Sequence, residues 1–236
     1  MITMIISVYI WIIGIVSIGL MLMTGIFLSF LLPQRTVDRF VKAGCRFSLR
    51  LMFINVRVDG SEHIDPERTY LFMANHVSLF DVPVLEGHVP HFFRAVEADR
   101  QFKWPVYGYA VRRFGNIPID RSSIHGSILS MKKAAQWLKT GNSLMILPEG
   151  HRTLDGRLGI FKKLPFHVAK QADVPILPIG MSGLFYLKAK KSWIIRPTQV
   201  TVKIGRPVPV NQVRVLSETE LRDHVRDKIE QLIERP

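Results

Sequence analysis

The stretch Tyr70-Leu-Phe-Met-Ala-Asn-His-Val-Ser-Leu-Phe-Asp81 decides the fold class and holds the first candidate site. Its first five residues form a short apolar run, which is typical of a buried strand. Polar residues follow at once, beginning with Asn75 and His76. In α/β proteins, functional side chains gather where strands end. The stretch therefore predicts a buried strand, a polar loop at its carboxyl end, and a helix whose first turn contains Asp81.

Outward from this stretch, short apolar strands alternate with helices. Such alternation predicts an α/β domain with a largely parallel or mixed sheet flanked by helices. One helix should start at Ser122 or Ser123 and end at Gly141, and the capping box of Ser217 and Glu220 should start the last helix. The strand at 200–204 is expected near a sheet edge. The other expected strands are 54–58, 70–74, 92–96, 117–119, 143–147 and 174–179, and a further helix is expected at 166–171.

The start of the chain predicts a membrane segment. Residues 1–34 contain no Asp, Glu, Lys or Arg, so the whole net charge of +13 lies on the residues that follow. A straight helix over the apolar residues 1–32 would be about 48 Å long, whereas a hydrocarbon core is roughly 30 Å thick. The segment can therefore span with residues to spare, tilt, or break into two helices at a glycine. We expect it to be retained, because the basic start and small-residue cleavage site of a signal peptide are not evident.

Residues 35–53 predict a basic amphipathic helix. Next to an apolar anchor, such a helix is typical of an element that binds an anionic bilayer surface; the alternative is an ordinary surface helix with a solvated basic face. By the positive-inside rule, these cations place the large domain on the cytoplasmic side of the membrane. We therefore divide the chain into N-terminal anchoring helices at 1–53 and a catalytic-sized domain at 54–236. The basic stripe is Arg35, Arg39, Lys42, Arg46 and Arg50, and the apolar side is Val37, Phe40, Val41, Gly44, Phe47 and Leu51.

Composition excludes several classes of protein. At 47% hydrophobic and 22% charged residues, the chain is not intrinsically disordered. Its one cysteine, Cys45, excludes a disulfide framework and a thiolate metal site. The sequence has no glycine-rich phosphate loop, and the histidines other than His76 lack metal-ligand spacing, so we expect no metal and no bound cofactor. The net charge would suit a nucleic-acid-binding protein, but that function leaves the polar clusters unexplained, and we expect no nucleic-acid partner.

The spacing of His76 and Asp81 suits a catalytic pair if a strand ends before the histidine and a helix begins at the aspartate. A carboxylate that accepts a hydrogen bond from one imidazole nitrogen leaves the other nitrogen free as a general base. The alternative is a histidine with a purely structural role.

Two further polar clusters follow expected strands. One is Pro148-Glu-Gly-His-Arg-Thr153 and the other ends in Asp120-Arg121. Arg121 and Arg152 could converge on an anionic group, because arginine suits bidentate phosphate binding. The structural alternatives are a tight turn at Glu149 and Gly150 and a local ion pair at a helix start.

Together and in this order, these clusters resemble the sequence blocks of the glycerolipid acyltransferase family, and within it the 1-acyl-sn-glycerol-3-phosphate acyltransferases. The resemblance covers roughly residues 55–209. The first block, Asn-His-x-x-x-x-Asp, is matched by Asn75, His76 and Asp81; the second by Gly115, Ile117, Ile119, Asp120 and Arg121; the third by Pro148, Glu149, Gly150 and Arg152; and the fourth by Val174, Pro175, Ile176 and Pro178.

The resemblance implies a glycerol-phosphate-acyltransferase-like sheet preceded by a membrane helix or helical hairpin. It implies acyl transfer from acyl-CoA or acyl carrier protein to the sn-2 hydroxyl of lysophosphatidic acid, which gives phosphatidic acid without a covalent acyl-enzyme. His76 would be the general base and Asp81 would orient it. The residues expected to bind substrate are Arg121, Glu149, Gly150, Arg152 and Arg100.

The chain departs from the family pattern in two places. Leu147, His151 and Thr153 replace a phenylalanine, a threonine and a serine of the third block. Many members also carry a phosphate-binding lysine before the position of Pro105, a role that Arg100 or Arg94 could take here. These departures keep open an acyltransferase for another lyso-lipid, such as a lyso-ornithine lipid or a lysophospholipid with a larger head group.

Overall fold

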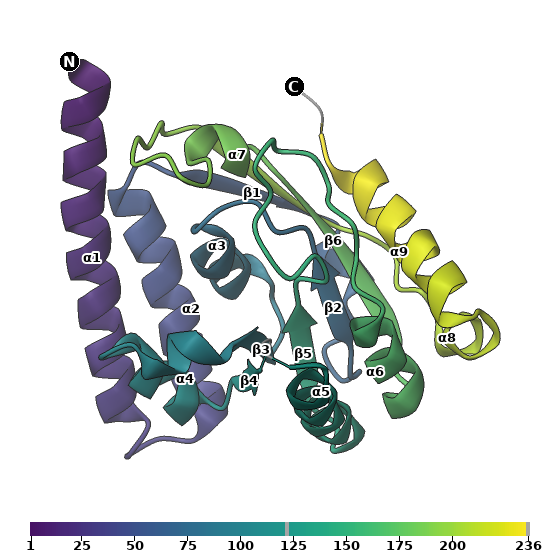
Figure 1. The fold of residues 1–236 in the computed structure, drawn as a ribbon. Coiled ribbons are helices and arrows are strands. Elements are labelled where there is room, and N and C mark those ends of the chain that lie inside the picture. Colours follow the sequence, from purple (N-terminus) through teal and green to yellow (C-terminus); the bar gives the residue numbers. More distant parts are fainter. Residues whose placement is uncertain (121–122, 235–236) are drawn as a thin grey trace.

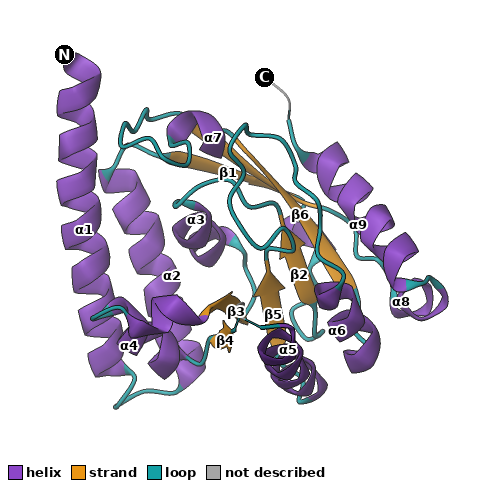
Figure 2. Cartoon of the chain, viewed as in Figure 1, coloured by secondary structure: helices purple, strands orange, loops and turns teal. Residues whose placement is uncertain are grey.

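The computed structural model describes residues 1–120 and 123–234, and over these residues seven strands form one mixed sheet in the order β1-β7-β6-β2-β5-β3-β4. All neighbouring strands are parallel except β6 and β7. Helices lie on both faces of the sheet (Figure 2). The predicted α/β class with a mixed sheet is confirmed. The strands are β1 (Asn55–Asp59), β2 (Leu71–Ala74), β3 (Phe93–Ala98), β4 (Ile117–Ile119), β5 (Ser143–Ile146), β6 (Ile176–Ser182) and β7 (Gln199–Ile204).

Most long helices agree with the sequence expectations. The capping box at the start of α9 is present, with the Ser217 N–H donating to Glu220 Oε2 at 2.8 Å and the Glu220 N–H donating to Ser217 Oγ at 3.3 Å. The helices are α1 (Ile2–Leu28), α2 (Gln34–Leu51), α3 (Asp81–His88), α4 (Tyr107–Phe114), α5 (Ile124–Lys139), α6 (Leu164–Ala172), α7 (Leu184–Leu187), α8 (Val210–Val215) and α9 (Glu218–Leu232), with 3-10 turns η1 (Ser61–His63) and η2 (Asp99–Lys103).

Strand β2 lies in the middle of the sheet and is buried on both faces. Leu71 and Met73 pack into the core beneath α5, α6 and α9. Phe72 and Ala74 pack into the core on the opposite face, beneath α2 and α3. Strands covered on both sides read as continuous apolar runs, which explains why this segment has no polar residue before Asn75.

Helix α1 is continuous through its three glycines and forms a hairpin with α2 (Figure 1). Two glycines of the hairpin allow close packing. A Cβ on Gly14 would lie 2.9 Å from Sδ of Met52, and one on Gly44 would collide with the side chain of Met21. The alternative of a break at a glycine within residues 1–32 is therefore wrong, and this segment forms one helix that pairs with α2.

The rest of the chain contacts α1 near both of its ends. Near the N-terminus, Trp11 Nε1 donates to the carbonyl of Trp193 at 2.8 Å, and after the last turn Arg113 donates to the carbonyl of Ser29 at 2.8 Å. Among the described residues, α1 is the one helix long and apolar enough to cross a membrane. Large exposed apolar surfaces of this kind mark membrane or protein contacts. Its exposed side chains include Met4, Ile5, Val8, Ile12, Ile15, Val16, Leu20, Met23 and Phe27.

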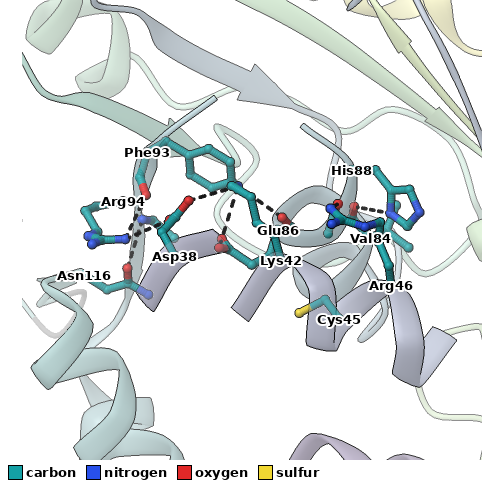
Figure 3. Close-up of polar contacts among 12 residues, drawn as sticks. Asp38, Lys42, Cys45, Arg46, Val84, Glu86, His88, Phe93, Arg94 and Asn116 are labelled. Carbon is teal, nitrogen blue, oxygen red and sulfur yellow. Dashed lines mark hydrogen bonds and ion pairs between the residues drawn. The ribbon is translucent and has the colours of Figure 1, made fainter. Parts of the chain in front are cut away.

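The cations of the basic stripe on α2 have two kinds of surroundings: some are bonded to α3 and the others are exposed. Lys42 Nζ donates to the carbonyl of Glu86 at 3.1 Å, and Arg46 Nη1 donates to the carbonyl of Gly87 at 2.7 Å (Figure 3). These carbonyls lie in the last turn of α3, where cations are favourable. The expectation that the whole stripe faces a membrane is therefore wrong for Lys42 and Arg46. The exposed cations of the stripe are Arg35, Arg39 and Arg50.

We expect Lys42→Met to destabilise the fold by about 3 kcal/mol, because removing one partner of a buried ion pair leaves the other charge unpaired. Lys42 Nζ lies 3.8 Å from Asp38 and 3.7 Å from Glu86. Without Lys42, Asp38 would keep its ion pair with Arg94, whereas Glu86 would have no ion-pair partner among the described residues. Chemical denaturation in detergent measures the loss, with the exposed Arg39→Met as control.

The same variant should show a defined pH dependence. Burial raises the pKa of Glu86, and Lys42 opposes that rise. Without the lysine, the folded-state pKa lies further above the unfolded value, so the loss is smallest in acid and grows as pH rises through the folded-state pKa. An equal loss at about pH 5 and about pH 8 would contradict this assignment.

Candidate active site

His76 and Asp81 form a hydrogen-bonded pair where β2 ends and α3 begins. The distance from His76 Nδ1 to Asp81 Oδ2 is 2.6 Å. The buried carboxylate also accepts the N–H groups of Val77 at 2.8 Å and Ser78 at 2.9 Å. An ionised carboxylate can only accept, so the imidazole proton lies on Nδ1 and Nε2 is free to accept a proton. The structure thus brings together the two residues that the sequence predicts as a pair.

Glu149 holds the backbone of His76 in place. Strands β2 and β5 are parallel neighbours, so the loops after them leave the same edge of the sheet (Figure 1). The His76 N–H donates to Glu149 Oε1 at 2.6 Å, the Gly159 N–H donates to Oε2 at 2.9 Å, and the Thr153 N–H donates to the His76 carbonyl at 2.9 Å. Burial raises the pKa of Glu149, against the effect of both backbone donors. Each carboxylate oxygen accepts one backbone N–H, so Glu149 fixes the backbone of His76. Its expected part in binding substrate stays a prediction.

Asn75 ties the first polar loop to β6. Its Nδ2 donates to the carbonyl of Met181 at 2.9 Å, and its Oδ1 accepts the Met181 N–H at 2.7 Å. Ser78 makes a second link, since its Oγ donates to the carbonyl of Lys188 at 2.8 Å. Sequence reasoning missed both roles, because each partner lies more than a hundred residues away in the chain.

The expected anion-binding residues have different surroundings. Gly150 has a φ of +77°, which suits the tight turn after β5, and the partly buried Arg152 follows it. Arg100 is exposed on η2, directly after β3. Arg121 lies outside the described residues. Arg94 is buried and bonded to Asp38 at 3.2 Å (Figure 3), so this arginine is not free to bind a phosphate.

An apolar cavity of about 610 Å³ lies between the hairpin and the domain. This volume is within the roughly 300–1,000 Å³ typical of ligand pockets. Leu79 and Phe80, two of the residues between His76 and Asp81 in the chain, line it, whereas His76 and Asp81 are not among its lining residues. Trp11, Ile15 and neighbouring α1 residues form another wall. The loop between His76 and Asp81 therefore forms part of the wall of an apolar cavity.

Comparison with known proteins agrees with this geometry. The crystal structure of the 1-acyl-sn-glycerophosphate (LPA) acyltransferase from Thermotoga maritima matches 97% of this chain and 93% of its own, with a TM-score of 0.84 and 26% identity. A 1-acyl-sn-glycerol-3-phosphate acyltransferase of Chlamydomonas reinhardtii is 27% identical over 83% of this chain and 59% of its own. The human enzyme of that name, form alpha, is 34% identical over 73% of this chain and 62% of its own. The chain thus spans about three fifths of the length of these two relatives.

A protein-family model, described as acyltransferase, matches residues 55–182. The matched segment runs from β1 to the end of β6 and contains the His76–Asp81 pair and Glu149. It covers more than half of the sequence. The chain therefore belongs to the acyltransferase family.

Proposed function

We propose that this protein transfers an acyl group from acyl-CoA or acyl carrier protein to the sn-2 hydroxyl of lysophosphatidic acid, giving phosphatidic acid. The observation that carries the proposal is the hydrogen-bonded pair of His76 and Asp81, which flanks a loop that lines an apolar cavity walled by a membrane-type helix. A thioester with a long acyl chain needs both a general base and an apolar space. The names of the relatives support the choice of acceptor.

In the proposed reaction, His76 Nε2 takes the proton of the acceptor hydroxyl as its oxygen attacks the thioester carbonyl. A C–O bond forms, and the tetrahedral intermediate then breaks its C–S bond. The imidazolium returns the proton to the departing thiolate, so the products are an ester and a free thiol. Asp81 stabilises the transient imidazolium and holds the ring orientation.

Cations near the pair would hold the phosphate of the acceptor. Arg152, in the loop that contacts His76, is the described residue best placed for this role. The resemblance assigns Arg121 to the same phosphate, and Arg100 is a further candidate. Arginine is suited to this task because its planar guanidinium binds phosphate in a bidentate manner.

The proposed site lies at the depth of its lipid substrates. Because the domain contacts α1 along its length, we infer that α1 lies along the membrane surface with its exposed apolar side in the bilayer. Arg35, Arg39 and Arg50 would contact anionic head groups, and we propose that the catalytic domain lies on the cytoplasmic face.

A thioester-release assay with lysophosphatidic acid tests the proposal. The purified protein is mixed with acyl-CoA or acyl carrier protein donors, free thiol is measured, and phosphatidic acid is identified by mass spectrometry. Product formation that depends on the acceptor supports the proposal, and turnover with one donor identifies the carrier. Absence of acyl transfer with both donors would overturn it.

A second candidate acceptor is another lyso-lipid. The observation in its favour is His151, which stands exposed beside Arg152 in place of the usual threonine. A panel of lysophosphatidic acid, lyso-ornithine lipid and lysophospholipids with larger head groups separates the candidates. A strong preference for a phosphate-free acceptor would favour this second function.

A further inference from the structure

Lys188, directly after α7, is a buried lysine without a carboxylate partner. Only 6% of its surface is exposed. Its Nζ donates to the carbonyl of Ala189 at 3.3 Å, and no carboxylate in residues 1–120 and 123–234 forms an ion pair with it. Burial lowers the pKa of Lys188, and the positive charge of Arg152 lowers it further. A buried charge is costly unless it is paired, so this position invites a functional explanation.

Lys188 lies where the two active-site loops and the cavity meet. Its carbonyl accepts the Ser78 hydroxyl in the loop that contains His76. Two residues later, Lys190 Nζ donates to the carbonyl of Arg152 at 3.1 Å. The Lys188 ammonium is 5.8 Å from the ring centre of Trp11, a residue of the cavity wall. The loop after α7 runs from this end of the sheet toward α1 (Figure 1).

We propose that Lys188, together with Arg152, binds the phosphate of a substrate in the active site. This inference rests on the proposed acyl transfer. Arg152 also has no ion pair within the described residues, so neither cation has a carboxylate that would compete with a bound phosphate. Arginine would bind phosphate in a bidentate manner and lysine would add a point charge. The Trp11 ring partly stabilises the ammonium group of Lys188 by a cation–π interaction.

The phosphate could belong to the lysophosphatidic acid acceptor or to the donor, because acyl-CoA and acyl carrier protein both carry phosphate. We infer only that the ligand of Lys188 is a phosphate group. Kinetic measurements can show whether the acceptor or the donor carries it. The test compares Lys188→Met with Lys191→Met, an exposed lysine of the same loop whose loss changes the net charge equally. The KM for acceptor and donor, kcat, and the melting temperature without substrate are measured for each variant.

We expect Lys188→Met to raise the KM for one phosphate-bearing substrate at least about tenfold, while kcat changes by a few-fold at most and Lys191→Met resembles the unmodified protein. The substrate whose KM rises identifies the source. Because an unpaired buried cation is removed, the melting temperature without substrate should stay equal or rise. Inorganic phosphate should raise the melting temperature of the unmodified protein and not that of Lys188→Met.

Three results would overturn the inference. The first is an unchanged KM for both substrates in Lys188→Met. The second is a fall in kcat and melting temperature with KM unaffected, which indicates a purely structural lysine. The third is failure of both Lys188→Met and Lys188→Gln to fold. If the unmodified protein transfers no acyl group to lysophosphatidic acid, the proposed function itself fails, so the two failures are distinguishable.

Discussion

His76→Ala should lower kcat by about 10²- to 10⁴-fold, the range by which a positioned general base accelerates proton transfer. The variant removes the Nε2 that accepts the hydroxyl proton. The fold should survive, because the hydrogen bonds that fix this residue to Glu149 and Thr153 use its backbone. Asp81 keeps its two backbone donors as well. The thioester-release assay gives kcat, and circular dichroism reports the fold.

His167→Ala is the matched control. His167 is exposed on α6, where its imidazole contacts Glu218, and it has no part in the pair of His76 and Asp81. We expect its kcat to remain within a few-fold of the unmodified value. Near-normal turnover in a well-folded His76→Ala protein would remove His76 from the mechanism.

Asp81→Asn should lower kcat by a comparable factor, about 10³- to 10⁴-fold, for a different reason. Asp81 accepts hydrogen bonds from the imidazole and from the N–H groups of Val77 and Ser78. An asparagine side chain has one oxygen, which accepts, and one NH₂ group, which only donates. If the asparagine oxygen keeps the Ser78 N–H, the NH₂ takes the place of Oδ2 and faces Nδ1 of His76. The imidazole then carries its proton on Nε2, which cannot act as a base.

The same substitution should also reduce stability by about 1–3 kcal/mol, the cost of leaving a buried polar group unsatisfied. Chemical denaturation in detergent measures this loss. The two effects are separable, since kcat is measured under conditions in which the variant remains folded. An Asp81→Asn enzyme with near-normal kcat would show that Asp81 has only a structural role.

The secondary structure could be predicted where the pattern of residues reports burial directly. Strand β2 is apolar throughout because both of its faces are covered, and α9 carries a capping box at its start. Helices α4, α7 and α8 were not predicted. They have four to eight residues, too few turns for helical periodicity to be distinguished from a loop, and their stability depends on the domain around them.

The surroundings of the charged residues could not be predicted in the same way. The basic stripe of α2 suggested one membrane-facing surface, but Lys42 and Arg46 bind the end of α3. Arg94 looked available for a phosphate, but Asp38 of α2 neutralises it. A long charged side chain can reach several partners, and the choice depends on which elements pack beside it.

By itself, the sequence determined the α/β class, the apolar first segment and the pairing of His76 with Asp81. These features are local: strand and helix periodicity, helix caps and a five-residue spacing involve neighbours along the chain. Only the tertiary structure decided that Glu149 holds the His76 backbone and that the Ser78 hydroxyl donates to the carbonyl of Lys188. Those contacts join residues many tens of positions apart, and they arise when parallel strands bring their following loops to one edge of the sheet.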